Sequence, residues 1–228
     1  MQITGRELNL IYDINKEECT YAFKNINICL NAHETVGIMG PSGCGKSSLL
    51  YVLSGMKIPT GGTVYYDDVD INFYSADERA KIRRSKFGMI FQKHFLIDYL
   101  SVLDNVLSAV NAKSKENIDR AMEILESLKI SHLAKRKPGQ ISCGQKQRAA
   151  IARALINNPE VIFADEPTAS LDHNNAIEVI NLLNQFKDRS TIVIATHDRT
   201  ILNNSDRIIE LWDGYAKNEI KRNTVLCE

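Results

Sequence analysis

Residues 40–48 read Gly40-Pro41-Ser42-Gly43-Cys44-Gly45-Lys46-Ser47-Ser48. They match the phosphate-binding pattern G-x-x-x-x-G-K-[ST] at every fixed position. The apolar run before them, residues 35–39, predicts a strand, and residues 48–54 predict the start of a helix. Glycines let such a loop aim its N–H groups at phosphate oxygens, and the helix N-terminus adds a partial positive charge. The stretch therefore predicts a nucleoside triphosphate site, in preference to a glycine-rich turn with a structural role.

Two side chains of this loop are expected to contact the nucleotide and its metal. Lys46 should reach the β- and γ-phosphates, and the Ser47 hydroxyl should bind Mg²⁺. The loop thus predicts a nucleoside triphosphate and Mg²⁺ as cofactors.

The composition indicates a globular chain with balanced charge. Its 228 residues include 28 Lys plus Arg and 28 Asp plus Glu, so no overall field draws it to nucleic acid or acidic lipid. Five cysteines without a C-x-x-C pair indicate a reducing compartment. The longest apolar runs fall well short of the roughly 20 residues that span a bilayer. We therefore expect a cytoplasmic protein that binds no nucleic acid and does not insert into the membrane, so that any membrane association comes through a partner.

The first part of the chain is rich in strand patterns. Residues 3–30 alternate in short segments and predict an antiparallel edge sheet. Within it, Ile26, Ile28 and Leu30 should share one face. Residues 61–71 predict a hairpin that turns at an Asp-Asp pair.

The middle of the chain changes to a helical period. A charged segment, residues 77–86, precedes a short apolar strand at residues 87–92. Apolar residues then recur at spacings of three and four in residues 103–110 and 118–128. Ser142 is predicted to open a third helix. Together these segments predict a helical insertion between strands.

Two further strands end in residues that can carry chemistry. The continuous apolar run 161–164 predicts a strand buried on both faces, and it leads to Asp165 and Glu166. Burial of two carboxylates is costly unless they hold a cation or a polarised water. The next strand, residues 191–195, leads to His197. Ligands of parallel α/β sheets lie at the carboxyl ends of the strands, so the phosphate loop, the two acids and the histidine should converge on one site.

Together these residues resemble the ATP-binding subunit of ABC transporters, over nearly the whole chain and in the family's order. The most diagnostic element is Ile141-Ser142-Cys143-Gly144-Gln145, which is similar to the family signature Leu-Ser-Gly-Gly-Gln. The resemblance implies an α/β fold, with a P-loop NTPase core whose mainly parallel sheet is flanked by helices, an antiparallel β subdomain and an α-helical insertion subdomain. It implies one ABC ATPase domain over residues 1–228, in which residues 1–92 and 160–228 form the core plus β subdomain and about 93–159 form the helical signature subdomain.

Cys143 departs from this signature, because the family has a glycine there. If the backbone at this position needs a positive φ, a cysteine would be strained where a glycine is not. The two signature positions that the family uses for the γ-phosphate, Ser142 and Gly144, are unchanged.

The resemblance also implies catalytic and metal-binding roles. Gln92 is similar to the glutamine that contacts Mg²⁺ and the attacking water. Asp165 would hold Mg²⁺ through water, and Glu166 would act as the general base. His197 would contact the γ-phosphate. The implied catalytic residues are Glu166, His197, Lys46 and Gln92. The implied cofactors are ATP and Mg²⁺.

Further nucleotide contacts are implied outside the phosphate loop. Tyr12 looks like the aromatic residue that stacks on adenine, with Tyr21 as the alternative. Asp172 belongs to a segment similar to the loop that communicates between paired subunits. The implied nucleotide-binding residues outside the loop are Tyr12, Ser142, Gly144, Gln145 and Asp172.

In the family the signature completes the nucleotide site of a second subunit. We therefore expect an ATP-dependent head-to-tail homodimer with two nucleotides at its interface. Residues 75–106 look most like the subfamily for lipoprotein release, macrolide export and peptide-antibiotic export, which pairs separate ATPase chains with membrane subunits. The implied function is ATP binding and hydrolysis that power export or extraction through a separate membrane permease.

Other functions are weighed against this one. An ABC ATPase acting on DNA or ribosomes would carry long coiled coils or a second domain, and neither is present. A GTPase would carry an Asn-Lys-x-Asp motif, which the sequence lacks. A regulatory ABC ATPase that controls a cell-envelope partner without moving solute stays open, as does import, because the membrane subunit sets the output.

Overall fold

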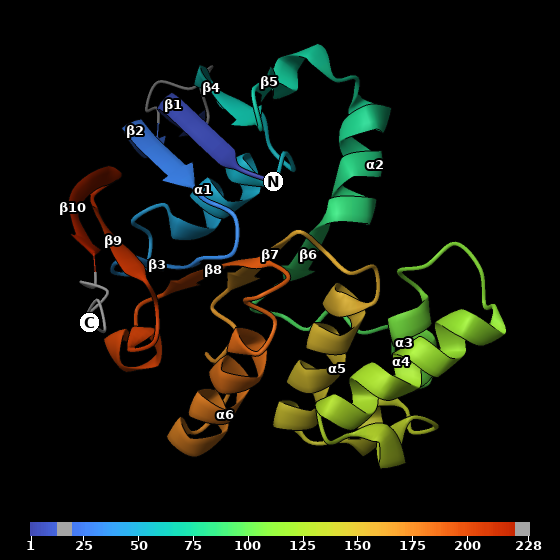
Figure 1. Ribbon diagram of the computed structural model, residues 1–228. Coiled ribbons are helices and arrows are strands. Elements are labelled where there is room, and N and C mark those ends of the chain that lie inside the picture. Colours follow the sequence, from blue (N-terminus) through green and yellow to red (C-terminus); the bar gives the residue numbers. More distant parts are fainter. Residues whose placement is uncertain (13–19, 222–228) are drawn as a thin grey trace, which may run out of the picture.

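The computed structural model describes residues 1–12 and 20–221. Within these ranges the strands form two sheets, and helices cover both faces of the larger one (Figure 1). This is the α/β fold class that the sequence predicts.

The smaller sheet is antiparallel and comes from the N-terminal part of the chain. Its strands are β1 (Ile3–Tyr12), β2 (Thr20–Leu30), β4 (Gly61–Tyr66) and β5 (Val69–Asp70). They pair in the order β2-β1-β4-β5. Ile26, Ile28 and Leu30 are all buried, as their spacing predicts.

The larger sheet is mainly parallel. Its strands are β3 (Thr35–Met39), β6 (Phe87–Ile90), β7 (Val161–Asp165), β8 (Thr191–Thr196), β9 (Arg207–Trp212) and β10 (Tyr215–Lys221). In the order β10-β9-β3-β8-β7-β6, all neighbours run parallel except β10, which is antiparallel to β9. The carboxyl ends of β3, β7 and β8 therefore meet at one edge of this sheet.

Two hydrophobic cores lie on the two faces of the larger sheet. One holds α1 (Lys46–Leu53) and the antiparallel sheet, and the other holds α3 (Val102–Leu107), α4 (Lys115–Ser127), α5 (Cys143–Leu155) and α6 (His173–Asn184). Along β7, Val161 and Phe163 pack into the first core, whereas Ile162 and Ala164 pack into the second. Alternate residues of a strand point to opposite faces, so one continuous apolar run serves both cores.

The charged segment before β6 is a helix, α2 (Ala76–Lys86), which its sequence pattern did not predict. Ser75 caps it, because its Oγ accepts a hydrogen bond from the Glu78 N–H while Oε2 of Glu78 accepts one from the Ser75 N–H. No residue of α2 is buried, so the helix has no apolar stripe to reveal it.

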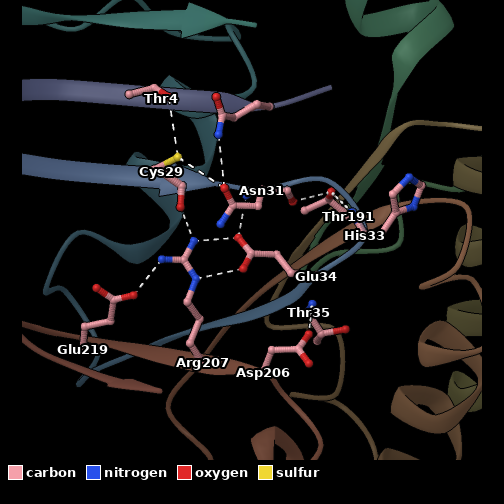
Figure 2. A network of polar contacts seen from close by, with 11 residues as sticks. Thr4, Cys29, Asn31, His33, Glu34, Thr35, Thr191, Asp206, Arg207 and Glu219 are labelled. Atoms are coloured by element: carbon pink, nitrogen blue, oxygen red, sulfur yellow. Dashed lines mark hydrogen bonds and ion pairs between the residues drawn. The ribbon is translucent and has the colours of Figure 1, made fainter. Parts of the chain in front are cut away.

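Arg207, at the start of β9, ties the two sheets together (Figure 2). Its guanidinium group bonds both carboxylate oxygens of Glu34, at 3.0 and 2.6 Å, and an oxygen of Glu219 on β10 at 2.7 Å. The same group donates to the backbone carbonyl of Cys29 on β2. These contacts lie at the opposite end of the strands from the carboxyl edge.

The predicted division into subdomains is compatible with this arrangement but stays a prediction. Helices α3 to α5 fall inside residues 93–159, between β6 and β7. Short 3₁₀ helices lie at Ile71–Phe73, Ser131–Leu133, Pro138–Gln140 and Arg199–Leu202. Across the described residues, no helix has both the length and the apolar character needed to cross a bilayer.

Candidate nucleotide site

The predicted phosphate loop joins β3 to α1, and two of its glycines have left-handed backbone conformations. Gly43 has a φ of 82°, and Gly45, the N-cap of α1, has a φ of 101°. A Cβ atom on Gly45 would lie 2.2 Å from the carbonyl oxygen of Ala22, whereas a Cβ on Gly43 would meet nothing within 4 Å. Packing therefore requires glycine at position 45, and the open space at Gly43 lets a phosphate approach the backbone.

Lys46 places its ammonium group inside this loop. The side chain is 6% exposed, and Nζ donates hydrogen bonds to the carbonyl oxygens of Gly40 at 2.8 Å and Pro41 at 2.9 Å. The same nitrogen lies 3.6 Å from Oε1 of Glu166. A buried charge needs such partners, and these oxygens hold it at the loop.

Asp165 is a buried carboxylate at the end of β7. The residue is 3% exposed, its Oδ1 accepts a 2.7 Å hydrogen bond from Ser47 Oγ, and its Oδ2 accepts one of 3.1 Å from Tyr51 Oη. Burial raises the pKa of the carboxyl group, and the two hydrogen bonds act in the opposite direction. Burial and the charge of Asp165 raise the pKa of Tyr51 to about 12, so its hydroxyl stays protonated as a donor. The Asp165 carboxylate and the Ser47 hydroxyl supply hard oxygen atoms of the type that Mg²⁺ prefers.

Glu166 lies between Lys46 and His197. Its backbone has a φ of 46°, and its N–H donates a 2.9 Å hydrogen bond to the carbonyl oxygen of Ala195 on β8. Nδ1 of His197 is 3.0 Å from Oε1 and 3.1 Å from Oε2 of the Glu166 carboxylate. A bulky residue held at positive φ is uncommon, and such positions cluster at functional sites.

A cavity of about 390 Å³ gathers most of the predicted residues. Those that line it are Tyr12, Ser42, Gly43, Gly45, Lys46, Ser47, Ser48, Gln92, Glu166 and His197. Gly40 and Pro41 line a neighbouring cavity that shares His197 as a wall. The structure thus brings together residues that follow four different strands, β3, β6, β7 and β8.

Both tyrosines proposed to stack on adenine border this cavity. Oη of Tyr12 lies 3.0 Å from Oγ of Ser48, and Nζ of Lys57 lies 3.5 Å from the centroid of the Tyr12 ring. Tyr21 is 48% exposed, and Nζ of Lys24 lies 3.5 Å from its ring centroid. The geometry fits either ring, and the assignment of Tyr12 stays a prediction.

The signature residues lie elsewhere in the same chain. Ser142, Gly144, Gln145 and Asp172 line a second cavity of about 420 Å³ beside the N-terminal ends of α5 and α6. Ser142 is exposed and caps α5, because its Oγ accepts from the Gln145 N–H at 3.3 Å and Oε1 of Gln145 accepts from the Ser142 N–H at 2.8 Å. Asp172 caps α6 through the N–H of Asn175. Within one chain, the signature and the phosphate loop therefore line different cavities.

The structure places the side chains of two cysteines in the predicted motifs. Cys143 is the first residue of α5 and does not have a positive φ, so the strain considered for a cysteine in the signature does not arise. Cys44, expected among the nucleotide-binding residues, turns its side chain into the core beside α1, where burial raises the pKa of the thiol. The cavity is therefore lined by the other loop residues and not by the Cys44 side chain.

Residues 23–169 match the model of the ABC transporter family. This match spans more than half of the chain and includes both the phosphate loop and the signature. The chain belongs to the ABC transporter family.

Relatives of this ABC ATP-binding chain confirm the predicted subfamily. It is 42% identical over 214 residues to the ABC transporter ATP-binding protein MJ0796 of Methanocaldococcus jannaschii, covering 90% of this chain and 91% of that protein. It is 38% identical over 200 residues to the lipoprotein-releasing system ATP-binding protein LolD of Xanthomonas campestris, covering 86% and 84%. It is 39% identical over 203 residues to the macrolide export ATP-binding/permease protein MacB of Campylobacter jejuni, covering 87% of this chain but 32% of MacB.

Solved structures confirm the fold. The dimeric MJ0796 cassette in a post-hydrolysis state bound to ADP and Pi has a TM-score of 0.88 at 39% identity, covering 96% of this chain and 98% of that chain. The cbiO1 protein from Clostridium perfringens, part of the ABC transporter complex cbiONQ, has a TM-score of 0.84 at 33% identity, covering 96% and 88%. The protein is an ABC transporter ATP-binding subunit of the MacB and LolD type.

One residue of the ABC site was missing from the sequence prediction. The Tyr51 hydroxyl contacts Asp165, although the phosphate-binding pattern stops before position 51. A signal was present, because Tyr51 follows Ser47 by four positions on a predicted helix and so lies on the same helix face.

Proposed function

We propose that this chain binds ATP with Mg²⁺, hydrolyses it, and as a homodimer powers export or extraction of a substrate through a separate membrane permease. The convergence of Lys46, Glu166 and His197 on one cavity carries this proposal. The names of two relatives, a lipoprotein-releasing and a macrolide export protein, favour export or extraction over import.

The phosphate loop would supply most of the electrostatic stabilisation. Phosphoryl transfer needs positioning and charge neutralisation more than covalent catalysis. The loop N–H groups, the N-terminus of α1 and the Lys46 ammonium group would bind the phosphate oxygens. The open space beside Gly43 supports this fit, because it leaves the backbone accessible.

Ser47, Asp165 and Gln92 would hold Mg²⁺. The Ser47 hydroxyl lies 2.7 Å from the Asp165 carboxylate, and Gln92 lines the same cavity as Ser47. Mg²⁺ usually binds through a few protein oxygens together with substrate phosphates, which this donor set allows. When bound, the ion would neutralise charge on the phosphate oxygens.

Glu166 would act as the general base. Its carboxylate would take a proton from the attacking water, and the neighbouring Lys46 and His197 hold it in place at 3.6 and 3.0 Å. Gln92 would orient this water, and His197 would contact the γ-phosphate. Tyr12 would stack on the adenine ring.

A second copy of the chain would complete each nucleotide site. Ser142 is exposed on a surface apart from its own phosphate loop, so it and Gly144 are free to face the γ-phosphate of a partner. Asp172 would lie at the same interface. The dimeric MJ0796 structure with ADP and Pi supports this arrangement.

A groove on the helical side would receive the membrane permease. It has a volume of about 660 Å³, and its lining includes Met89, Phe91, Phe95 and Arg153. Phe95 is 62% exposed and packs edge-on against Phe91 in this groove, and exposed apolar side chains that gather in a groove are typical of protein–protein sites. Gln92 lines the nucleotide cavity and lies between Phe91 and Phe95, which line the groove. This segment would therefore connect the nucleotide site to the permease. The protein would then lie at the inner face of the membrane through this subunit.

ATP turnover by the purified chain tests the catalytic part of the proposal. Glu166→Gln should reduce hydrolysis by roughly 10²- to 10⁴-fold and leave ATP binding intact, because it removes only the general base. Lys46→Ala should weaken ATP binding itself, because it removes the cation that binds the phosphates. Normal turnover by Glu166→Gln would contradict the assigned role.

Purification of the tagged chain from membranes tests the transport part. We expect an integral membrane permease to co-purify with it. A cell-envelope enzyme or division protein recovered in place of a permease would favour the regulatory alternative.

A further inference from the structure

Tyr51 contacts the carboxylate that is proposed to bind Mg²⁺. Its Oη donates a 3.1 Å hydrogen bond to Oδ2 of Asp165, while Ser47 donates one of 2.7 Å to Oδ1. The two hydroxyls therefore hold both oxygens of the carboxylate. Asp165 is 3% exposed, so water has little access to replace either donor.

The Tyr51 ring is itself fixed by packing. It lies against the core formed by α1 and the antiparallel sheet. Its centroid is 6.4 Å from that of Phe91, at an interplanar angle of 53°, and Phe91 in turn packs edge-on against Phe95 at 5.4 Å. Aromatic pairs of this kind add to the stability of a fixed orientation. The hydroxyl is therefore presented to Asp165 in one direction, next to the segment that carries Gln92.

We propose that Tyr51 is a positioning residue for the metal site, whose hydroxyl fixes the Asp165 carboxylate and leaves Oδ1 and the Ser47 hydroxyl to serve Mg²⁺. This inference rests on the proposed function, because it concerns the Mg²⁺ that accompanies ATP. Without the Tyr51 hydroxyl, Oδ2 would be a buried acceptor with no donor among the described residues, and the carboxylate would no longer be held in one orientation.

The expected size of the effect follows from the indirect position of Tyr51. Hydrogen-bond partners of metal ligands typically contribute roughly 10- to 100-fold to metal affinity. Asp165 is expected to hold Mg²⁺ through water, so we expect the lower end of that range, about tenfold.

ATP affinity with and without a metal separates this role from simple packing. In the Glu166→Gln parent, where hydrolysis is expected to be strongly reduced, ATP binding is measured by equilibrium dialysis with EDTA and with saturating Mn²⁺ as the probe metal. Tyr51→Phe in this parent keeps the ring and removes the hydroxyl. It should reduce the gain in ATP affinity that Mn²⁺ provides by about tenfold, and it should leave the affinity in EDTA unchanged.

Tyr66→Phe is the matched control. Its Oη donates a 3.1 Å hydrogen bond to the carbonyl oxygen of Leu53, at the far end of α1, and touches no carboxylate of the site. Tyr66→Phe should change the ATP affinity neither in EDTA nor in Mn²⁺. Thermal unfolding in EDTA checks that both variants are folded. A full Mn²⁺ gain in Tyr51→Phe, or an equal loss in EDTA and Mn²⁺, would overturn the proposal. Failure of the parent itself to bind ATP would instead contradict the proposed function, which separates the two failures.

Discussion

Gly45 shows how one residue fixes the geometry of the phosphate loop. Gly45 is the N-cap of α1 and has a φ of 101°. The carbonyl of Ala22 on β2 fills the space that a Cβ at this position would need. The phosphate loop, α1 and the antiparallel sheet are therefore in contact at Gly45. Gly43 shares the positive φ but faces the open cavity.

This contrast gives a prediction for a matched pair of substitutions. Gly43→Ala should lower the free energy of unfolding by about 1–2 kcal/mol, the cost of a left-handed backbone for an L-residue. Gly45→Ala should lower it by roughly 3–4 kcal/mol, at the upper end of single-residue effects, because the added methyl group also collides with the Ala22 carbonyl. Urea unfolding of the two variants measures the difference. Equal losses of unfolding free energy in the two variants would show that the structure relieves the collision with the Ala22 carbonyl without a cost in stability.

Residue patterns predicted the position of the phosphate loop better than they predicted the residues that support it. Lys46 and Ser47 were predictable because the pattern fixes their spacing within the eight residues 40–47. The bond between Tyr51 and Asp165 joins residues 114 positions apart, so it depends on how α1 and β7 pack. The helical spacing places Tyr51 on the same helix face as Ser47, but it does not show that this face packs against Asp165.

At the scale of elements, Arg207 holds the antiparallel sheet against the edge of the parallel one. Its guanidinium group is 11% exposed and its partner Glu34 is 14% exposed, so both charges are largely removed from water. Removal of one partner would leave the other charge buried and unpaired.

Arg207→Met should therefore destabilise the fold by roughly 3–5 kcal/mol. Arg199→Met is the control, because Arg199 is 60% exposed and its Nη1 lies 3.6 Å from Glu210. An exposed pair of this kind contributes about 0–1 kcal/mol. Urea unfolding of both variants provides the comparison, and similar losses would mean that the contacts of Arg207 do not hold the sheets together.

Glu178 on α6 provides a pH-dependent link between helices. Its carboxylate accepts hydrogen bonds from Lys129 at 3.0 Å and from Arg148 on α5 at 2.7 Å, and both contacts lower the pKa of Glu178. A carboxyl group whose pKa is lower in the folded state stabilises the fold above its unfolded pKa, and this stability is lost as the pH falls through the folded pKa.

Glu178→Gln should therefore be less stable than the unchanged chain at pH 7, by about 0.5–1 kcal/mol because the pair is partly exposed. The difference should fade as the pH drops below about 4, where the free carboxyl group takes up its proton. Denaturation of both proteins between pH 7 and pH 3 measures this trend. A difference that stays constant over that range would show that the ionised carboxylate is not its source.

The predictability of each element depends on what it buries. The strands β7 and β8 were predictable because their continuous apolar runs serve two cores. Helix α2 buries no residue, so the apolar period gave no signal, although the capping pair Ser75 and Glu78 was present in the sequence. Cap residues were the better guide at α5, which begins after Ser142 as predicted.

At the scale of the whole molecule, the phosphate loop and the signature are separated. They line different cavities of one chain, and the signature serine is exposed. The strand order β10-β9-β3-β8-β7-β6 brings the loop, Glu166 and His197 together but not Ser142. Local patterns predict which segments are strands, whereas the order in which they pair depends on contacts between distant segments. The separation supports the proposal that a second chain completes each nucleotide site.

Light scattering of the Glu166→Gln variant tests the proposed two-chain site under conditions in which hydrolysis is expected to be too slow to interfere. With saturating ATP and Mg²⁺, the variant should have twice the mass of one chain, and it should return to the mass of one chain when ATP is removed. Ser142→Arg in the same background is the control: it should still bind ATP but remain a single chain. A single-chain mass for Glu166→Gln at saturating ATP and Mg²⁺ would contradict the proposed dimer.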